Sequence, residues 1–351
     1  MPGRTRNVTS SDTQNSAKVF HCHVGRSVYY LRIILSVWIL AVLTGLSTGC
    51  DINQSKPIFR VATSQWIGYE TLYLAKSLGE YQHHPIKLVQ MPASSDVINA
   101  LLNRNVEAAT LTLGEAISVN DTGFDLRIVL VLDFSHGADA LIARHYISDI
   151  HSLRRKRIGM EKTAVGFIML DAALSAGGIG IDDIEIIPFT TNSHEDAFLS
   201  HRVEAIVTSE PVKTRLLNGG KGTVLFDSTK IPGRIVDVLV VRNDIIHQHR
   251  DTLDRLIHGH FQALSYLKEA PHKSATIIAP RLWISPNQVL EAYKGIRLPD
   301  MEENQLLLSG KSQKLVDTTT ELVQTMSKFG LLANKPDLLS ILDNHWFMQA
   351  R

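Results

Sequence analysis

Cysteine is nearly absent from this 351-residue sequence, and neither sign of charge is in excess. The only cysteines are Cys22 and Cys50, so no disulfide can form within the chain beyond Cys50. Residues 50–351 carry 31 basic and 34 acidic side chains, which excludes the strongly basic footprint of a nucleic-acid-binding protein. Hydrophobic residues make up 44% and aromatic residues 7%, which indicates a soluble globular protein and not a disordered, collagen-like or many-span membrane chain.

The first fifty residues have the order of an export signal. Residues 33–46 read IILSVWILAVLTGL, follow Arg26 and Arg32, and precede small residues and Cys50. A basic segment, an apolar run and a small-residue ending are typical of a secretory signal, so we expect a signal peptide at residues 1–49. The apolar run is shorter than the roughly 20 residues that span a bilayer, and an uncleaved anchor helix is the alternative. Either arrangement places residues 51–351 outside the cytoplasmic membrane.

The segment Leu46-Ser-Thr-Gly-Cys50 resembles a bacterial lipobox, although Ser47 occupies the position three before the cysteine where leucine is usual. The resemblance implies that Cys50 is lipidated and becomes the mature N-terminus. In lipoproteins of some Gram-negative bacteria, an aspartate directly after this cysteine, as in Asp51, is associated with retention on the inner membrane. We therefore expect a periplasmic protein with a lipid anchor in the cytoplasmic membrane.

Residues 57–241 alternate short apolar runs with amphipathic segments. Strands are predicted at residues 59–63, 86–89, 108–112, 127–132, 140–143, 157–160, 184–188, 205–208, 223–226 and 237–241. Helices are predicted at residues 70–78, 96–102 and 164–175, the second with Ser94 and Ser95 as candidate N-caps. This alternation predicts an α/β fold with parallel sheets and helices on both faces.

Strands are no longer predicted after Asp244. Helices are expected at residues 252–268, 286–293, 311–329 and 336–342, packed around the first α/β unit. The expected organisation is a linker at 50–56, the first part of lobe 1 at 57–145, lobe 2 at 146–236, and the return strand and C-terminal helices of lobe 1 at 237–351. Ligands of open α/β sheets collect beyond the carboxyl ends of the strands, so we expect a ligand cleft between the lobes.

Four motifs occur in register along the mature chain. They are SQWIGYETLYLA at 64–75, DFSHGAD at 133–139, AIVTSEP at 205–211, and LFDS at 225–228 followed by PGRIVD at 232–237. In order and spacing, over about residues 57–340, they resemble the SsuA/THI5-like (NMT1-like) substrate-binding proteins of nitrate, sulfonate and taurine ABC importers. The resemblance implies a type 2 periplasmic-binding-protein fold, and a monomer that captures a small polar or heteroaromatic solute by lobe closure, performs no chemistry, and passes the solute to a membrane permease.

Candidate ligand-binding residues follow predicted strands or lie near the lobe crossovers: Ser64, Trp66, Tyr69, Glu70, Thr112, Ser135, Asp139, Thr163, Glu210 and Asp237. Trp66 and Tyr69 can form a wall of the cleft, or else seal their loop against the core. The hydroxyls of Ser64 and Thr112 can contact a ligand, although each is the more readily explained as a helix cap.

The acidic candidates also have structural explanations. Glu70 complements the helix dipole in the first turn of its helix and needs no other role. Asp133 is expected to be structural, whereas Asp139 can either orient a ligand amine or fix its own loop. The candidate set is rich in carboxylates, with Arg234 the only nearby guanidinium, which favours a ligand bearing an amine over a bare anion. Helix N-termini can nevertheless hold an oxyanion without any cationic side chain.

The fifteen histidines do not have the spacing of a metal site, and neither a catalytic residue nor a cofactor is expected. His258 and His260 point about 200° apart on a helix, and the His194-Glu195 pair lacks the second histidine of a zinc-protease motif. Two alternatives stay open. One is a pyrimidine-synthase-like enzyme of the same fold, although the cysteine-rich iron motif of those relatives is absent. The other is a ligand-sensing partner of a membrane receptor.

Overall fold

The computed structural model describes residues 29, 31–38, 57–334, 338–343 and 345–347. The chain divides into two units, residues 1–56 and the compact unit 57–351. In the first unit, residues 31–38 are helical. The rest of the expected signal, the lipidation site Cys50 and the linker at 50–56 lie outside the described residues. In the described part of the chain, no helix combines the length and the apolar character needed to cross a bilayer.

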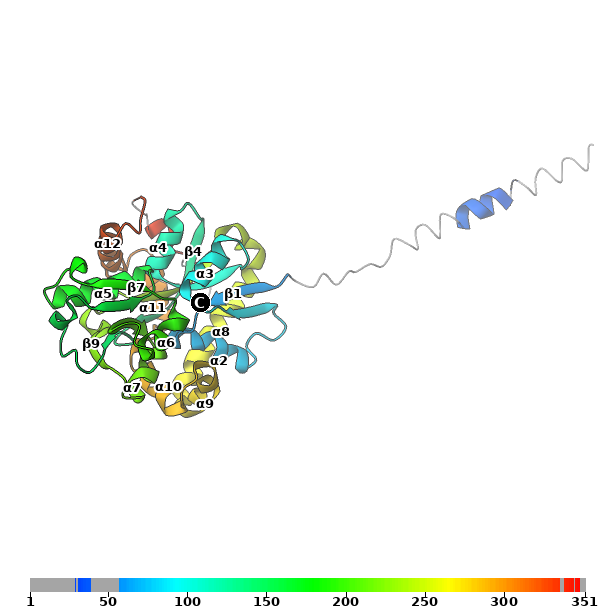
Figure 1. The fold of residues 1–351 in the computed structure, drawn as a ribbon. Helices are drawn as coiled ribbons and strands as arrows, with labels where there is room; N and C mark the ends of the chain where they lie inside the picture. The colour runs from blue at the N-terminus through cyan, green and yellow to red at the C-terminus, as the bar shows by residue number, and fades with distance from the viewer. Residues whose placement is uncertain (1–28, 30, 39–56, 335–337, 344, 348–351) are drawn as a thin grey trace, which may run out of the picture. The chain divides into compact units, whose positions relative to one another are not determined.

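The compact unit contains two β-sheets (Figure 1). The first sheet has the order β11-β4-β10-β3-β1-β2, and the second has the order β7-β6-β8-β5-β9. The strands of the first sheet are β1 Phe59–Thr63, β2 Ile86–Gln90, β3 Ala108–Thr112, β4 Leu126–Ser135, β10 Val236–Arg242 and β11 Ile296–Arg297. Those of the second are β5 Asp139–Ala143, β6 Arg157–Met160, β7 Glu185–Pro188, β8 Ala205–Ser209 and β9 Thr223–Asp227.

The expectation of parallel sheets is wrong for part of each sheet. Strands β1, β2 and β3 run parallel, but β10 is antiparallel to both β3 and β4. In the second sheet β6, β7 and β8 are parallel, and β5 runs antiparallel to β8 and β9. Strands β5 and β10 are those at which the chain enters the second sheet and returns to the first, and the short β11 is also antiparallel to β4. Short apolar runs do not encode this reversal, because a strand buried on both faces looks the same in either direction.

Helices flank both sheets and also form most of the C-terminal region. Their bounds are α2 Glu70–Ser77, α3 Ser94–Leu102, α4 Leu113–Asp121, α5 Ala164–Ala176, α6 His194–Leu199, α7 Val212–Asn218, α8 Arg250–Glu269, α9 Pro271–Leu282, α10 Pro286–Tyr293, α11 Met301–Leu308 and α12 Gln313–Lys328. Helices α8 and α9 pack on α2, and α11 packs on β4 of the first sheet, as expected for the helical tail. Helix α12 contacts α4 and also α5, so the tail reaches elements of both sheets.

Three local expectations are corrected by the structure. Strand β11 contradicts the absence of strands after Asp244. The predicted helix at 336–342 falls partly outside the described residues, and Leu338–Ile341 forms a 3₁₀ turn. Neither Ser94 nor Ser95 caps α3; the N-cap is Ala93, and both serines lie in the first turn.

Candidate ligand-binding site

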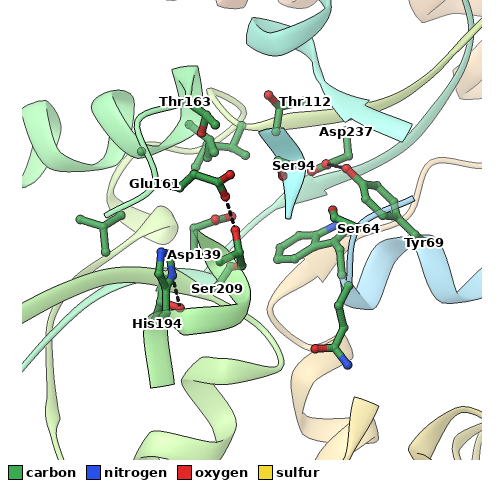
Figure 2. Close-up of a pocket in the computed structure, with 18 residues that line it drawn as sticks. Ser64, Tyr69, Ser94, Thr112, Asp139, Glu161, Thr163, His194, Ser209 and Asp237 are labelled. Carbon is green, nitrogen blue, oxygen red and sulfur yellow. Dashed lines mark hydrogen bonds between the residues drawn. The ribbon is translucent and has the colours of Figure 1, made fainter. Parts of the chain in front are cut away.

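A cavity of about 70 Å³ lies where elements of the two sheets meet (Figure 2). At about 10–15 Å³ per water, it holds roughly five waters, or a solute of a few heavy atoms. The lining from the first-sheet elements is Ser64, Gln65, Trp66, Tyr69, Ser94, Thr112, Ile235 and Asp237. The lining from the second-sheet elements is Asp139, Glu161, Thr163, Val165, Gly166, Thr191, His194, Val207, Thr208 and Ser209. Most of these residues follow the carboxyl end of a strand, where the topology of open α/β sheets collects ligands.

Trp66 and Tyr69, the aromatic residues on the first-sheet side of the cavity, are held by a buried pair of carboxyl groups. The Trp66 indole Nε1–H donates to Asp133 Oδ2 at 3.0 Å, and the Tyr69 hydroxyl donates to Asp237 Oδ1 at 2.5 Å. Asp133 and Asp237 are cross-strand partners on β4 and β10. These hydrogen bonds fix both buried rings, and both residues line the cavity.

The environment of this acidic pair favours a bound proton. Burial raises the pKa of Asp133 to about 7, against the hydrogen bond from Trp66, and the charge of Asp139 adds to the shift. Burial also raises the pKa of Asp237 well above its ordinary value, and the charge of Asp133 reinforces it. Two adjacent buried carboxylates repel each other, so the pair retains a proton near neutral pH.

Gly68 is required for the approach of Asp133 to the Trp66–Tyr69 turn. A Cβ atom at this position would lie 1.8 Å from Asp133 Oδ2 and 2.7 Å from the Trp66 Nε1 atom. We expect Gly68→Ala to lower the free energy of unfolding by about 1–3 kcal/mol, as overpacking does, and to displace the Trp66 ring. Urea unfolding monitored by tryptophan fluorescence measures both effects. Gly180→Ala is the matched control, since its Cβ would meet nothing closer than 3.8 Å; equal losses in the two variants would contradict this explanation.

Asp139 has a carboxylate oxygen without a hydrogen-bond partner. The residue begins β5, is only 7% exposed and lines the cavity, and its Oδ2 atom receives no hydrogen bond in the structure. Burial raises the pKa of Asp139 to about 6, against the hydrogen bond with Ser135 and the charge of Lys213. At pH 7 it is therefore mostly ionised, and an unpaired buried carboxylate costs free energy until a donor reaches it.

Glu161 connects the two sides of the cavity. Its Oε1 atom accepts from the backbone N–H and the hydroxyl of Ser95, at 3.1 and 2.7 Å, and its Oε2 atom accepts from the Thr191 hydroxyl. Ser95 belongs to α3 beside the first sheet, whereas Glu161 follows β6 of the second. The carboxylate therefore neutralises the N-terminal donors of α3 from across the cavity.

His194 lines the cavity on the second-sheet side. Its Nδ1 atom lies 3.2 Å from the Thr208 hydroxyl and its Nε2 atom lies 3.3 Å from the Phe189 carbonyl. The carbonyl can only accept, so Nε2 carries the proton and Nδ1 accepts from Thr208. Burial lowers the pKa of His194, which keeps the ring neutral at pH 7.

The structure brings seven of the ten sequence candidates to this cavity, and the remaining three lie elsewhere. Ser64, Trp66, Tyr69, Thr112, Asp139, Thr163 and Asp237 line it. Thr112 also caps α4 in a capping box with Glu115, as expected for its hydroxyl. Ser135 is buried, with its hydroxyl 2.7 Å from that of Ser228. Glu210 lines a second cavity beside the first, which shares Gln65 and Thr191 and includes the exposed Trp283.

The interpretation of Glu70 as a helix-dipole residue alone is wrong. Its side chain is 2% exposed and pairs with Arg281 Nε at 2.9 Å. Burial raises the pKa of Glu70 to about 7, while the Arg281 charge lowers it. The Arg281 guanidinium also stacks on Tyr73 and donates to Gln90, so this network fixes α9 against α2 and β2.

Sequence reasoning missed Glu161, Thr191 and His194. Glu161 directly follows the strand at 157–160, so the rule that placed Ser64 and Thr112 at the cleft also applies to it. Thr191 and His194 follow β7 in the same way. Among the described residues, no group of three or more histidine, cysteine, aspartate or glutamate side chains has the geometry to hold a metal ion.

Comparison with known protein families gives a match to the NMT1-like family over residues 53–281. The match covers most of the chain and includes the four motifs up to β10. The chain belongs to the NMT1-like family. A curated relative of this NMT1-like protein, from Brucella abortus strain 2308, carries the provisional name of a binding protein. It is 23% identical over 216 residues, 60% of this chain, and the match spans 64% of the relative's length.

Solved structures share the fold of this NMT1-like protein. The ligand-binding component of an ABC-type import system from Staphylococcus aureus, solved with zinc bound, gives a TM-score of 0.70 at 15% identity and covers 84% of this chain and 99% of its own. The alkanesulfonate-binding protein SsuA from Xanthomonas axonopodis pv. citri, bound to MOPS, gives 0.66 at 16% identity and covers 82% and 96%. The desulfurization enzyme DszB gives 0.61 at 16% identity, covering 82% and 97%. The periplasmic-binding-protein fold is thus shown, and it occurs in both binding proteins and an enzyme.

Proposed function

We propose that this protein is the extracytoplasmic solute-binding component of an ABC importer. In this proposal the cavity captures a small polar or heteroaromatic solute, and a membrane permease receives it. Strand β5 at 139–143 belongs to the second sheet, so the expected lobe boundary at 145 moves to before this strand. The lobes of this proposal are residues 57–138 with 236–351, and residues 139–235. A lipid on Cys50, or a retained helix, holds the monomer at the outer face of the cytoplasmic membrane.

The observation that carries the proposal is a small cavity shared by elements of both sheets and lined by ready-made polar groups. Its lining combines fixed aromatic rings, hydroxyls and the unpaired oxygen of Asp139. Such a mixture of rigid apolar walls and a few oriented polar atoms is typical of small-molecule sites. The Glu161–Ser95 contact joins the two sides across the cavity, as expected for a closed form of a two-lobed binding protein.

An enzymatic function has one feature in its favour, the hydroxyl of Thr208 against the neutral ring of His194. A hydroxyl nucleophile needs a base that can hold the transferred proton. Here burial lowers the pKa of His194, and Nε2 faces the Phe189 carbonyl instead of a carboxylate that would stabilise an imidazolium. This arrangement fits a structural hydrogen bond better than proton abstraction.

Isothermal titration calorimetry of the purified full-length protein tests binding. The panel consists of taurine, ethanesulfonate, nitrate, an aminopyrimidine and ethanolamine. We expect at least one solute to bind with a stoichiometry of one. Ser209→Trp, which fills the cavity, should abolish that binding, whereas Ser265→Trp on the exposed surface of α8 should leave it unchanged. Failure of every solute to bind, or equal binding by the Ser209→Trp variant, would contradict the proposal.

A further inference from the structure

The carboxyl groups that line the cavity are those of Asp139, Glu161 and Asp237, and neither a lysine nor an arginine is among the described lining residues. Because the Asp133–Asp237 pair retains a proton, the negative charge at the cavity comes mainly from Asp139 and Glu161. The nearby cation Lys213 donates to the Gly137 carbonyl at 2.6 Å and lies 3.7 Å from Glu210, so its charge is already compensated. A bare anion entering this space would meet negative charge without a cationic partner.

Helix N-termini, the other common partners of anions, are already supplied with carboxylates of this chain. Glu161 accepts from Ser95 in the first turn of α3. Glu115 accepts from the Thr112 N–H in the capping box of α4 and lies close enough to Thr163 for that hydroxyl to lower the pKa of Glu115. Thr163 is the N-cap of α5, so an acid of the protein lies beside each of the starts of α3, α4 and α5. Helix α6, which begins at the lining residue His194, has Glu195 and Asp196 in its own first turn.

Asp139, by contrast, lacks a hydrogen-bond donor for one of its carboxylate oxygens. Its Oδ2 atom is buried at the cavity and receives no hydrogen bond. Figure 2 shows Asp139 and Glu161 on the same side of the cavity, with Tyr69 and Asp237 on the other. A positively charged group that enters would satisfy the Asp139 carboxylate in a cavity that Trp66 and Tyr69 also line, and aromatic rings attract cations.

We infer that the solute is a small organic cation bearing N–H groups, an ammonium or amidinium, and that Asp139 accepts a hydrogen bond from it. The N–H requirement comes from the unpaired Oδ2 atom, which a quaternary ammonium group would leave unsatisfied. Glu161 contributes charge while remaining bonded to Ser95. This inference rests on the proposed function and specifies its ligand class.

The test is a titration of the full-length protein with matched probes. Ethanolamine, guanidine and acetamidine are the cations, and 2-hydroxyethanesulfonate and nitrate are the anions. We expect at least one cation to bind and neither anion to do so. Asp139→Asn should weaken cation binding by about ten- to a hundred-fold, the effect of losing one charge-assisted hydrogen bond. Asp182→Asn, at an exposed position, is the matched control and should bind as the wild type does.

Glu161→Gln provides a second variant, because the amide oxygen can still accept from Ser95 while the charge is lost. It should weaken cation binding several-fold with an unchanged circular dichroism spectrum. Tighter binding of an anion than of any cation, or cation affinity equal in Asp139→Asn and wild type, would overturn the inference while leaving a solute-binding function intact. Binding of Zn²⁺ in place of the organic cations would also overturn it. Binding of no probe and of no solute in the wider panel would reject the function as well.

Discussion

Replacing Asp237 by asparagine is expected to stabilise the protein at pH 8 and to change its stability little at pH 4. In the folded state burial and the charge of Asp133 raise the pKa of Asp237 well above its ordinary value. A carboxyl whose pKa is raised on folding contributes stability below its unfolded pKa near 4, and this contribution is lost as the pH rises. Asparagine resembles the protonated acid and does not titrate. At pH 8 the variant should therefore be more stable than the wild type, because it removes the cost of ionising this buried acid.

The same linkage predicts that wild-type stability increases as the pH falls from 8 to about 6.5. Asp133 and Glu115, each with a pKa raised to about 7, take up protons in this range. Below it, His194 and His260 act in the opposite direction, because burial lowers their pKa and their protonation in the unfolded chain favours unfolding. Urea unfolding across this range measures the slope. If the Asp237→Asn variant is no more stable at pH 8 than the exposed control Asp182→Asn, ionisation of the Asp133–Asp237 pair does not destabilise the folded protein, and the explanation is contradicted.

Among the variants proposed for this protein, loss of the Arg281 guanidinium should lower the free energy of unfolding the most. Arg281→Met leaves Glu70 buried without its partner and removes the bond to Gln90, which should cost about 3–5 kcal/mol at pH 8. At pH 5 the loss should be smaller, because the Arg281 charge no longer lowers the pKa of Glu70 and the acid takes up a proton. Thermal or urea unfolding at the two pH values measures the difference.

A double variant separates the ion pair from simple packing. Adding Glu70→Gln to Arg281→Met removes the buried charge and should recover a substantial part of the loss at pH 8. The matched control is Lys294→Met, which breaks the exposed pair with Glu291 and should change stability by less than about 1 kcal/mol. Equal losses in Arg281→Met and Lys294→Met would contradict the role given to this network.

The sequence was most informative where the chemistry is local. The strands at 59–63, 108–112 and 157–160 have the predicted bounds, because each is an apolar run between clear breakers. The rule that ligands meet residues after parallel strands selected Ser64 and Thr112, and it would have selected Glu161 had it been applied after β6. The helix Pro271–Leu282 escaped prediction because Pro280 lies inside it and interrupts the pattern.

The remaining features depend on contacts between distant segments. Arg281 pairs with Glu70 across 211 positions, and Trp66 with Asp133 across 67. No local pattern distinguishes a buried, paired Glu70 from an exposed acid in the first turn of a helix. In the same way, the hydroxyl of Ser135 could not be assigned to Ser228 before the two strand ends were placed together.

The central claim is that the cavity binds its solute without altering it, and recovery of the bound molecule tests this most directly. The full-length protein is saturated with the solute selected by titration, held for hours, and examined by native mass spectrometry and by mass spectrometry of the released molecule. The account predicts one solute per chain, returned with its mass unchanged in the wild type and in Thr208→Val alike. A released product of different mass that disappears in Thr208→Val would contradict the account and favour an enzyme.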